Sequence, residues 1–195
     1  MATSPVTVGV LALQGAFALH REALERCGAD VVEVRKAEHL EGLDGLVIPG
    51  GESTTISKLL ETFALTEPVA KAIADDLAIF GTCAGMILLA SEVEDGRSDQ
   101  ISFGAIDISV RRNGYGRQID SFESDLVIDE LGSDPLRAIF IRAPVVTRVG
   151  PGVEVLAEVD GVPVLCRQGA VMVSSFHPEL TNDDRLHQRF IHSIG

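Results

Sequence analysis

Cys83 stands in a segment whose residue types and spacing favour nucleophilic chemistry. An apolar run leads into Phe80-Gly-Thr-Cys-Ala-Gly85, a helical pattern leaves it, and glycines lie two residues before and two after the cysteine. Such glycines permit the strained strand-to-helix turn of a nucleophile elbow, which exposes the side chain at the carboxyl edge of a sheet. A helix start would stabilise a thiolate, and the N–H of Ala84 would face a developing oxyanion. The alternative is a buried structural cysteine.

A cysteine nucleophile needs a base, and His177 is the best candidate. It lies in Ser174-Ser-Phe-His-Pro-Glu179, where Pro178 favours an extended backbone at the residue before it. Residues i and i+2 of an extended segment point to the same side, so Glu179 can orient the imidazole of His177. A strand-end histidine beside a solvated glutamate is the alternative. The cysteine elbow makes the functional interpretation the favoured one.

The other cysteines and histidines show no comparable pattern. Cys27 lies on the apolar face of a predicted helix and Cys166 ends an apolar run, so both are expected to be small core residues. Metal binding is not expected. His187 and His192 are five residues apart and lack the i, i+4 spacing of a ligand pair, and His20 and His39 have no evident partner.

Two further segments could hold a small anion or zwitterion. Pro49-Gly-Gly-Glu-Ser-Thr-Thr55 joins a strand to a helix, where free backbone N–H groups bind anions, but the lysine and spacing of a P-loop are absent. Glu52 would repel a polyphosphate, so a molecule with one carboxylate and one ammonium fits better. Arg111, Arg112 and Arg117 share a Gly-rich loop, and Arg142 follows a strand; a substrate carboxylate could pair with either group. For the Pro49–Thr55 segment the alternative is a tight turn that binds nothing. For the arginines it is a solvated basic loop.

Composition narrows the function classes. The chain has 195 residues, a net charge of −13, 46% hydrophobic residues and three cysteines. This profile is that of a globular protein, and the acidic excess without a Lys/Arg run argues against nucleic acid and anionic membranes as partners. The cysteine spacing suggests neither a disulfide framework nor a metal site. No signal peptide or membrane span is evident, so a reducing cytoplasm is the expected compartment.

The hydrophobic pattern predicts one α/β domain over residues 1–195. Its first half alternates strands with helices, which favours a mostly parallel sheet between two helical layers. The expected strands there are Val6–Leu13, Val31–Val34, Gly45–Ile48 and Leu77–Phe80, and the helices are Ala16–Cys27, Thr54–Phe63 after a cap at Ser53, one near Pro68, and Met86–Ala90. The second half predicts an antiparallel extension and a final helix: strands Ile106–Val110, Leu126–Ile128, Ile139–Ile141, Val153–Val159, Val162–Cys166 and Val171–Ser174, and helix Asp184–Ile194.

Taken together, these residues resemble the triad-type (class I) glutamine amidotransferases. The general pattern is Gly-x-Cys-x-Gly with His-Pro-Glu, found at Gly81–Gly85 and His177–Glu179. A narrower similarity, to the glutaminase subunits of pyridoxal 5′-phosphate synthases, rests on segments spread over nearly the whole chain: Leu13-Gln-Gly15, Pro49–Thr55, Gly116-Arg-Gln with Ser121-Phe-Glu123, Phe140-Ile-Arg-Ala-Pro144, and Ser175–Thr181. The resemblance implies a flavodoxin-like three-layer α/β fold.

The resemblance also implies a role for each residue. Cys83 would attack the side-chain amide of L-glutamine to form a glutamyl thioester, with His177 moving protons and Glu179 orienting it. Backbone N–H groups of Gly51 and Ala84 would form the oxyanion hole. Glutamine would be held by residues of three segments: Gly51, Glu52, Ser53, Arg112, Ile141 and Arg142. No cofactor or metal is implied for this chain.

The implied partner is a separate synthase subunit. Ammonia would pass through a tunnel to it, and the synthase would build pyridoxal 5′-phosphate from a pentose phosphate and a triose phosphate. The implied assembly has twelve synthase subunits carrying up to twelve glutaminase subunits, with Gln14 at the interface and beside the oxyanion turn. Two alternatives remain: the glutaminase of another amidotransferase, such as the histidine-pathway enzyme, or a flavodoxin-like binding or redox-sensing protein whose Cys83 is reactive but not hydrolytic.

Overall fold

A seven-stranded sheet forms the centre of the computed structural model, which describes residues 5–112 and 121–194. From one edge to the other its strands are β10 (Glu154–Val159), β11 (Val162–Gln168), β12 (Val171–Ser174), β4 (Ala78–Thr82), β3 (Gly45–Ile48), β1 (Thr7–Leu11) and β2 (Asp30–Val34). The strands from β12 to β2 all pair in parallel, whereas β10 and β11 add an antiparallel edge. The predicted mostly parallel α/β fold with an antiparallel extension is therefore confirmed.

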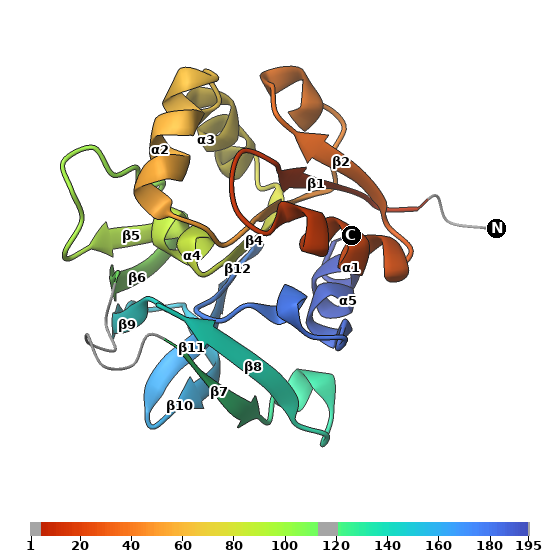
Figure 1. Ribbon diagram of the computed structural model, residues 1–195, viewed down its shortest axis with the longest axis vertical. Coiled ribbons are helices and arrows are strands. Elements are labelled where there is room, and N and C mark those ends of the chain that lie inside the picture. The colour runs from red at the N-terminus through yellow and green to blue at the C-terminus, as the bar shows by residue number, and fades with distance from the viewer. Residues whose placement is uncertain (1–4, 113–120, 195) are drawn as a thin grey trace.

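Helices cover both faces of this sheet (Figure 1). On one side lie α1 (Phe17–Arg26) and α5 (Arg185–His192), and on the other α2 (Ser53–Thr62), α3 (Thr66–Ala74) and α4 (Ala84–Leu89). Alternate strand residues feed two separate cores: Val47 and Phe80 pack with α1 and α5, whereas Leu46 and Ile79 pack with the other three helices. Because both faces of the sheet are buried, its inner strands are continuous apolar runs in the sequence.

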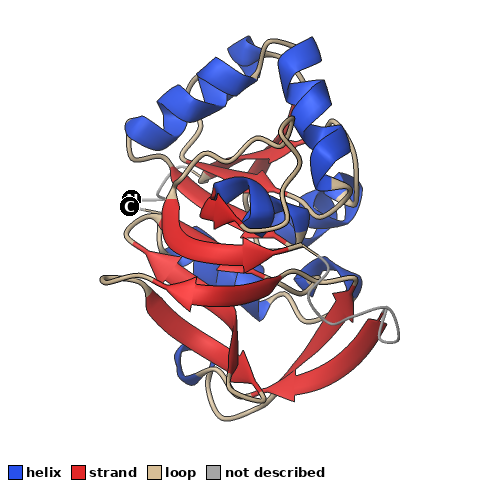
Figure 2. Cartoon of the chain, turned by 90° about the vertical axis from the view of Figure 1, so that its left-hand side faces the viewer, coloured by secondary structure: helices blue, strands red, loops and turns tan. Residues whose placement is uncertain are grey.

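Two small sheets accompany the central sheet. Strands make up most of the lower part of the molecule in Figure 2. One contains β5 (Ala90–Val93), β6 (Ile106–Arg111) and β9 (Val145–Val149); the other pairs β7 (Ser121–Leu126) with β8 (Leu136–Ile141). Short 3₁₀ turns lie at η1 (Ala37–Leu40), η2 (Asp129–Leu131) and η3 (Pro178–Leu180). Strands β5 and β9 were not predicted, and the strand expected at Leu126–Ile128 lies earlier, in β7.

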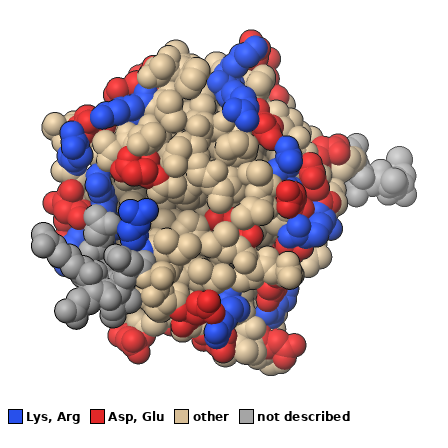
Figure 3. All heavy atoms as spheres, in the orientation of Figure 1, with Lys and Arg blue, Asp and Glu red and all other residues tan. Residues whose placement is uncertain are grey.

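Charged side chains lie mainly toward the rim of the face shown in Figure 3, with acidic and basic groups interspersed. The described residues form no basic patch on that face. Among the described residues, no helix combines the length and apolar character needed to cross a membrane.

The parallel strands bring distant segments of the sequence to one edge of the sheet. Because β1, β3, β4 and β12 run in the same direction, the segments that follow them meet at their carboxyl ends. Gln14 follows β1, Gly50 follows β3, Cys83 follows β4 and His177 follows β12. The fold thus converts four separate motifs into one site.

Candidate active site

A cavity of about 270 Å³ opens at this edge of the sheet. Its lining contains most of the residues selected from the sequence together with one further apolar side chain: Gln14, Gly51, Glu52, Ser53, Cys83, Ile87, Arg112, Ile141, Arg142 and His177. Binding pockets for drug-sized ligands begin at roughly 300 Å³, so this cavity suits a small metabolite. Ala84 is buried directly after Cys83, and Glu179 is buried behind His177; neither lines the cavity.

Cys83 occupies the strained turn that its glycines predicted. Its φ is +49°, a left-handed conformation that costs a non-glycine residue about 1–3 kcal/mol. A Cβ on Gly85 would lie 2.1 Å from the carbonyl oxygen of Ile48, and one on Gly81 would lie 2.6 Å from Leu89. The turn therefore requires both glycines because the chain passes so close to its neighbours. Cys83 is 6% exposed, and its Sγ donates to the carbonyl oxygen of Ile141 at 3.9 Å.

His177 lies between Cys83 and Glu179. Its Nδ1 is 2.8 Å from Oε1 of Glu179, and Cys83 is the other neighbour that acts on the pKa of the ring. Burial alone would lower the pKa of His177, but the hydrogen bonds and negative charge of Cys83 and Glu179 raise it to about 10. The predicted contact is present, although its expected cause was wrong: Pro178–Leu180 form the 3₁₀ turn η3 rather than an extended strand.

Glu179 has a second neighbour that sequence reasoning missed. Its Oε2 lies 3.2 Å from Nε2 of His20, a fully buried residue of α1. Burial would raise the pKa of Glu179, but the charges and hydrogen bonds of His20 and His177 hold it well below its usual range. The expectation that His20 has no partner was wrong; its partners lie far away in the sequence, so no local signal could have found them.

The turn after β3 contacts both the triad and Gln14. A Cβ on Gly50 would lie 2.4 Å from Cε1 of His177, so only glycine allows this approach. The Gly50 N–H donates to Thr82 Oγ1 at 3.1 Å, and the Glu52 N–H donates to Gln14 Oε1 at 2.8 Å. Gln14 therefore holds the turn that contains Gly51.

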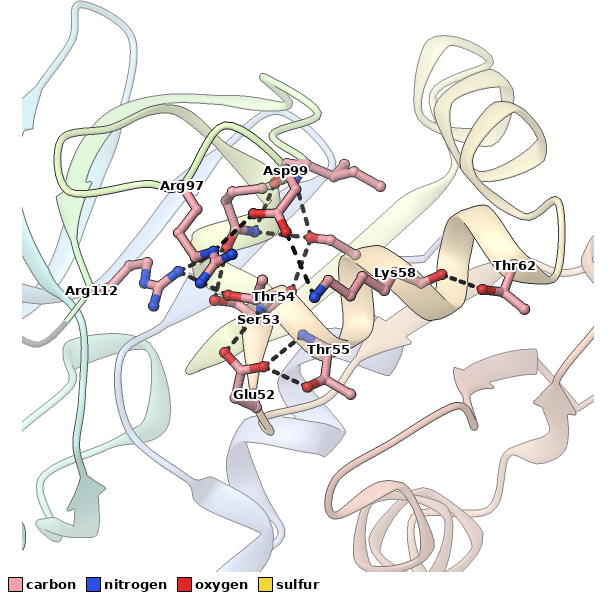
Figure 4. Close-up of polar contacts among 12 residues, drawn as sticks. Glu52, Ser53, Thr54, Thr55, Lys58, Thr62, Arg97, Asp99 and Arg112 are labelled. Carbon is pink, nitrogen blue, oxygen red and sulfur yellow. Dashed lines mark hydrogen bonds and ion pairs between the residues drawn. The ribbon is translucent and has the colours of Figure 1, made fainter.

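Glu52, rather than Ser53, caps helix α2, which corrects the expectation from the sequence. Its carboxylate accepts from the N–H of Thr54 at 3.1 Å and of Thr55 at 2.6 Å, and it points back toward Thr55 in Figure 4. Burial would raise the pKa of Glu52, but these hydrogen bonds lower it to about 2. Glu52 is therefore ionised at neutral pH.

Arg112 is tied to the start of α2 by a residue not selected from the sequence, Gln100. Arg112 donates to Thr54 Oγ1 at 3.0 Å and to Gln100 Oε1 at 3.3 Å, and Ser53 Oγ donates to the same Gln100 oxygen at 3.0 Å (Figure 4). The Gln100 amide in turn donates to Ser57 Oγ at 3.1 Å. Gln100 belongs to a polar loop without a recognisable motif, so only the fold reveals that it fixes two cavity-lining side chains.

Arg142 reaches the cavity from the segment after β8. Its φ is +43°, and both Arg142 and the half-exposed Ile141 line the cavity. Arg117, the third arginine of the Gly-rich loop, and the Gly116-Arg-Gln motif lie outside the described residues.

The other two cysteines have different surroundings. Cys166 is completely buried in β11, which raises its thiol pKa to about 12. Cys27 caps the end of α1, half-buried, and burial raises its pKa as well. Within residues 5–112 and 121–194 no group of three or more His, Cys, Asp or Glu side chains is arranged to hold a metal ion.

Comparisons with known proteins show which proteins this chain is similar to. The chain is 53% identical over 187 residues to a protein of Carboxydothermus hydrogenoformans named pyridoxal 5′-phosphate synthase subunit PdxT, covering 96% of this chain and 97% of that protein. A Rhodococcus jostii protein of the same name is 56% identical over 191 residues, covering 94% and 95%. A solved structure titled as a glutamine amidotransferase superposes with a TM-score of 0.90 at 52% identity, covering 96% of this chain and 98% of that one. Residues 10–195 match the family model as well, and the chain belongs to the SNO glutamine amidotransferase family.

Proposed function

We propose that this chain hydrolyses L-glutamine to L-glutamate and ammonia, with Cys83, His177 and Glu179 as its catalytic triad. The observation that carries the proposal is the position of His177, which hydrogen-bonds the buried Glu179 carboxylate and lines a metabolite-sized cavity together with Cys83. This arrangement combines a nucleophile, a base and an orienting carboxylate.

The proposed reaction has two stages. Because its pKa is raised to about 10, His177 holds at neutral pH the proton given up by Cys83, on the ring nitrogen that does not face Glu179, and the sulfur attacks the side-chain amide carbon of glutamine. The imidazolium then protonates the departing nitrogen, which leaves as ammonia, and a glutamyl thioester remains on Cys83. In the second stage His177 takes a proton from water, whose oxygen attacks the thioester, and glutamate and the free thiol are regenerated.

The cavity has complementary charges for a zwitterionic amino acid. Arg112 and Arg142 supply positive charge that can pair with the α-carboxylate, and the ionised Glu52 supplies negative charge for the α-ammonium. Gly51, Ser53 and Ile141 complete the proposed glutamine site. Amidotransfer by the family and the residue types of this cavity support glutamine as the substrate.

The N–H groups of Gly51 and Ala84 are the proposed oxyanion hole. Because glycine tolerates either peptide orientation, a flip at Gly50-Gly51 could complete the hole when a partner docks. The bond from the Glu52 N–H to Gln14 Oε1 supports Gln14 as the contact that controls this turn. Loss of one oxyanion donor costs about 10²–10³-fold in rate, which sets the size of the expected activation.

The proposed acceptor of the ammonia is the synthase subunit of a pyridoxal 5′-phosphate synthase. The names of relatives that match over at least 94% of this chain support this partner. We further propose that residues 1–195 form one domain, act in the cytoplasm, and join an assembly with up to twelve copies of each subunit.

The test is glutamate release from glutamine by the purified chain, with and without the synthase subunit and with Cys83→Ala as the blank. Release that rises strongly with synthase and disappears in the blank supports both the chemistry and the partner. Cys83-dependent release without a response to synthase points to another acceptor, such as the cyclase of the histidine pathway. If Cys83 forms a sulfenic acid with peroxide but no glutamate appears, a redox role replaces the proposal.

A further inference from the structure

A row of buried imidazoles continues the triad away from the cavity. Beyond Glu179 lies His20, and Nδ1 of His20 is 2.9 Å from Nε2 of His187 on α5. Both histidines are fully buried, and the Phe80 ring lies nearly perpendicular to each of them. Neither imidazole lines the cavity. These two titratable groups have no part in the proposed reaction as described so far.

The protons in this row have a preferred arrangement. Burial is the largest of the causes that lower the pKa of His187 to about 3, so His187 is neutral at pH 7 and carries one N–H. Its Nδ1 is buried and has no hydrogen-bond partner among the described residues. A bare nitrogen there costs less than an N–H without an acceptor, which places the proton on Nε2. The Nε2–H of His187 therefore donates to Nδ1 of His20.

This donation fixes the proton of His20. Since Nδ1 accepts, a neutral His20 carries its proton on Nε2, which lies 3.1 Å from Thr82 Oγ1 and 3.2 Å from Glu179 Oε2. The second oxygen of the buried carboxylate, Oε2, has no hydrogen-bond partner among the described residues, and Nε2 of His20, which bonds Thr82 Oγ1, lies beside it at ion-pair distance. The Nε2–H of His20 thus lies close to both the Glu179 carboxylate and the Thr82 hydroxyl, and this hydroxyl accepts from the Gly50 N–H.

We propose that His20 is a positioning residue for glutamine hydrolysis, whose Nε2–H orients the Glu179 carboxylate toward His177 and steadies Thr82 beneath the Gly50-Gly51 turn. The inference rests on the proposed function and adds to it a fourth side chain that touches neither substrate nor reacting atoms. His187 sets the tautomer of His20, and Glu179 accepts from His177 on Oε1 and faces His20 with Oε2.

The groups around His20 come from three elements. Thr82 ends β4, Glu179 lies in η3, and His187 lies on α5 with the Asp184–Arg26 ion pair beyond it. A neutral His20 lowers the pKa of Glu179 through its Nε2–H and not through a charge, so its removal raises that pKa and allows the carboxylate to take a proton at a higher pH. The acid side of the activity profile then moves upward in pH.

Three substitutions at this position separate the positioning role from packing. The amide nitrogen of Gln can occupy the place of Nε2, whereas the amide of Asn reaches only the place of Nδ1 and Leu supplies no polar group. With the synthase present, His20→Gln is expected to keep kcat close to wild type. We expect His20→Leu and His20→Asn to lose kcat roughly ten- to a hundredfold, the range for outer hydrogen-bonded partners at metal sites, with the KM for glutamine nearly unchanged.

A packing role gives a different result. It predicts that all three variants lower the melting temperature but retain the wild-type kcat per folded molecule and the wild-type pH profile, and this result would overturn the proposal. The wild-type chain and Cys83→Ala are assayed alongside. If wild type releases no Cys83-dependent glutamate, the proposed function itself fails, which distinguishes that failure from a failure at His20.

A measurement on the unsubstituted chain covers the case in which the variants do not fold. The ¹⁵N shifts of the histidine rings report which nitrogen carries the proton. The proposal requires His20 protonated on Nε2 at pH 7 and His187 protonated on Nε2 alone. A proton found only on Nδ1 of His20 would overturn it, because no N–H would then face Glu179.

Discussion

At the scale of single residues, we expect the cysteines to differ in reactivity because their surroundings differ. Cys83 lines the cavity beside His177, whereas Cys166 is fully buried and burial raises its pKa to about 12. Thiolate is the reactive form, so we expect iodoacetamide at pH 7.5 to alkylate Cys83 first and to leave Cys166 unmodified in the folded chain. Peptide mass mapping after a short exposure measures this order. Faster labelling of Cys166 would contradict the assignment of the nucleophile.

Glu179 controls the charge of His177, and this predicts a pH effect. Because Glu179 is one cause of the raised His177 pKa of about 10, Glu179→Gln lowers that pKa. If the imidazolium protonates the leaving nitrogen, the alkaline side of the kcat/KM profile moves to lower pH. The rate should fall less than in His177→Asn, which removes the base itself. An unchanged alkaline side in Glu179→Gln would show that the carboxylate does not act through His177.

Local spacing was sufficient to select Cys83, His177 and Glu179 as candidates, since flanking glycines and a His-x-Glu pair are visible over a few residues. The partners of His20 were not visible in this way. Thr82 and His187 lie 62 and 167 positions from it in the sequence. Gln100 was missed for a related reason: the two residues that it joins, Ser53 and Arg112, lie on different elements. Contacts of this kind depend on the completed fold.

At the scale of elements, the elbow depends on close backbone approach. Gly85 lies in the first turn of α4, where Ala would favour helix by about 1 kcal/mol. However, a Cβ would lie 2.1 Å from the Ile48 carbonyl oxygen, and overpacking of this kind costs about 1–3 kcal/mol or more. Gly85→Ala should therefore destabilise the fold in urea unfolding. The control is Gly28→Ala, which meets no atom within 4 Å and has only its φ of +86° to penalise it; a larger loss there would contradict this account.

The cap at the start of α2 predicts a modest, pH-dependent effect. Replacing an N-cap residue by Ala costs about 0.5–2 kcal/mol, and the exposure of Glu52 to water favours the lower end. Since folding lowers the pKa of Glu52 from 4.5 to about 2, its contribution is full above 4.5 and is lost as the pH falls through about 2. The difference in unfolding free energy between wild type and Glu52→Ala should thus shrink on acidification. A difference that grows instead would refute the cap.

The sequence was informative about strongly apolar elements and less so about polar ones. Gly45–Ile48 matched β3 at both ends because it is buried on both faces. Strands β5 and β9 contain exposed polar residues such as Glu92 and Arg148, so their apolar pattern is too weak to identify. The cap of α2 was assigned to Ser53 because serine is a favoured cap, whereas the longer Glu52 side chain reaches back to the same N–H groups.

At the scale of the whole molecule, topology explains why residues 14, 50, 83 and 177 meet. Neighbouring parallel strands present their carboxyl ends at one edge, and β1, β3, β4 and β12 each deliver one segment there. Alternating apolar strands and helices predicted such a sheet, but the strand order, which decides which segments are neighbours, is a property of tertiary packing.

The most direct test of the central claim is to trap the covalent intermediate. The chain is mixed with glutamine and synthase, quenched in acid within one turnover, and digested for peptide mass analysis. The account predicts a glutamyl group on the peptide that contains Cys83, absent in Cys83→Ala and present in Cys166→Ala. Glutamate production without an adduct on Cys83, or with an adduct on another residue, would contradict the account.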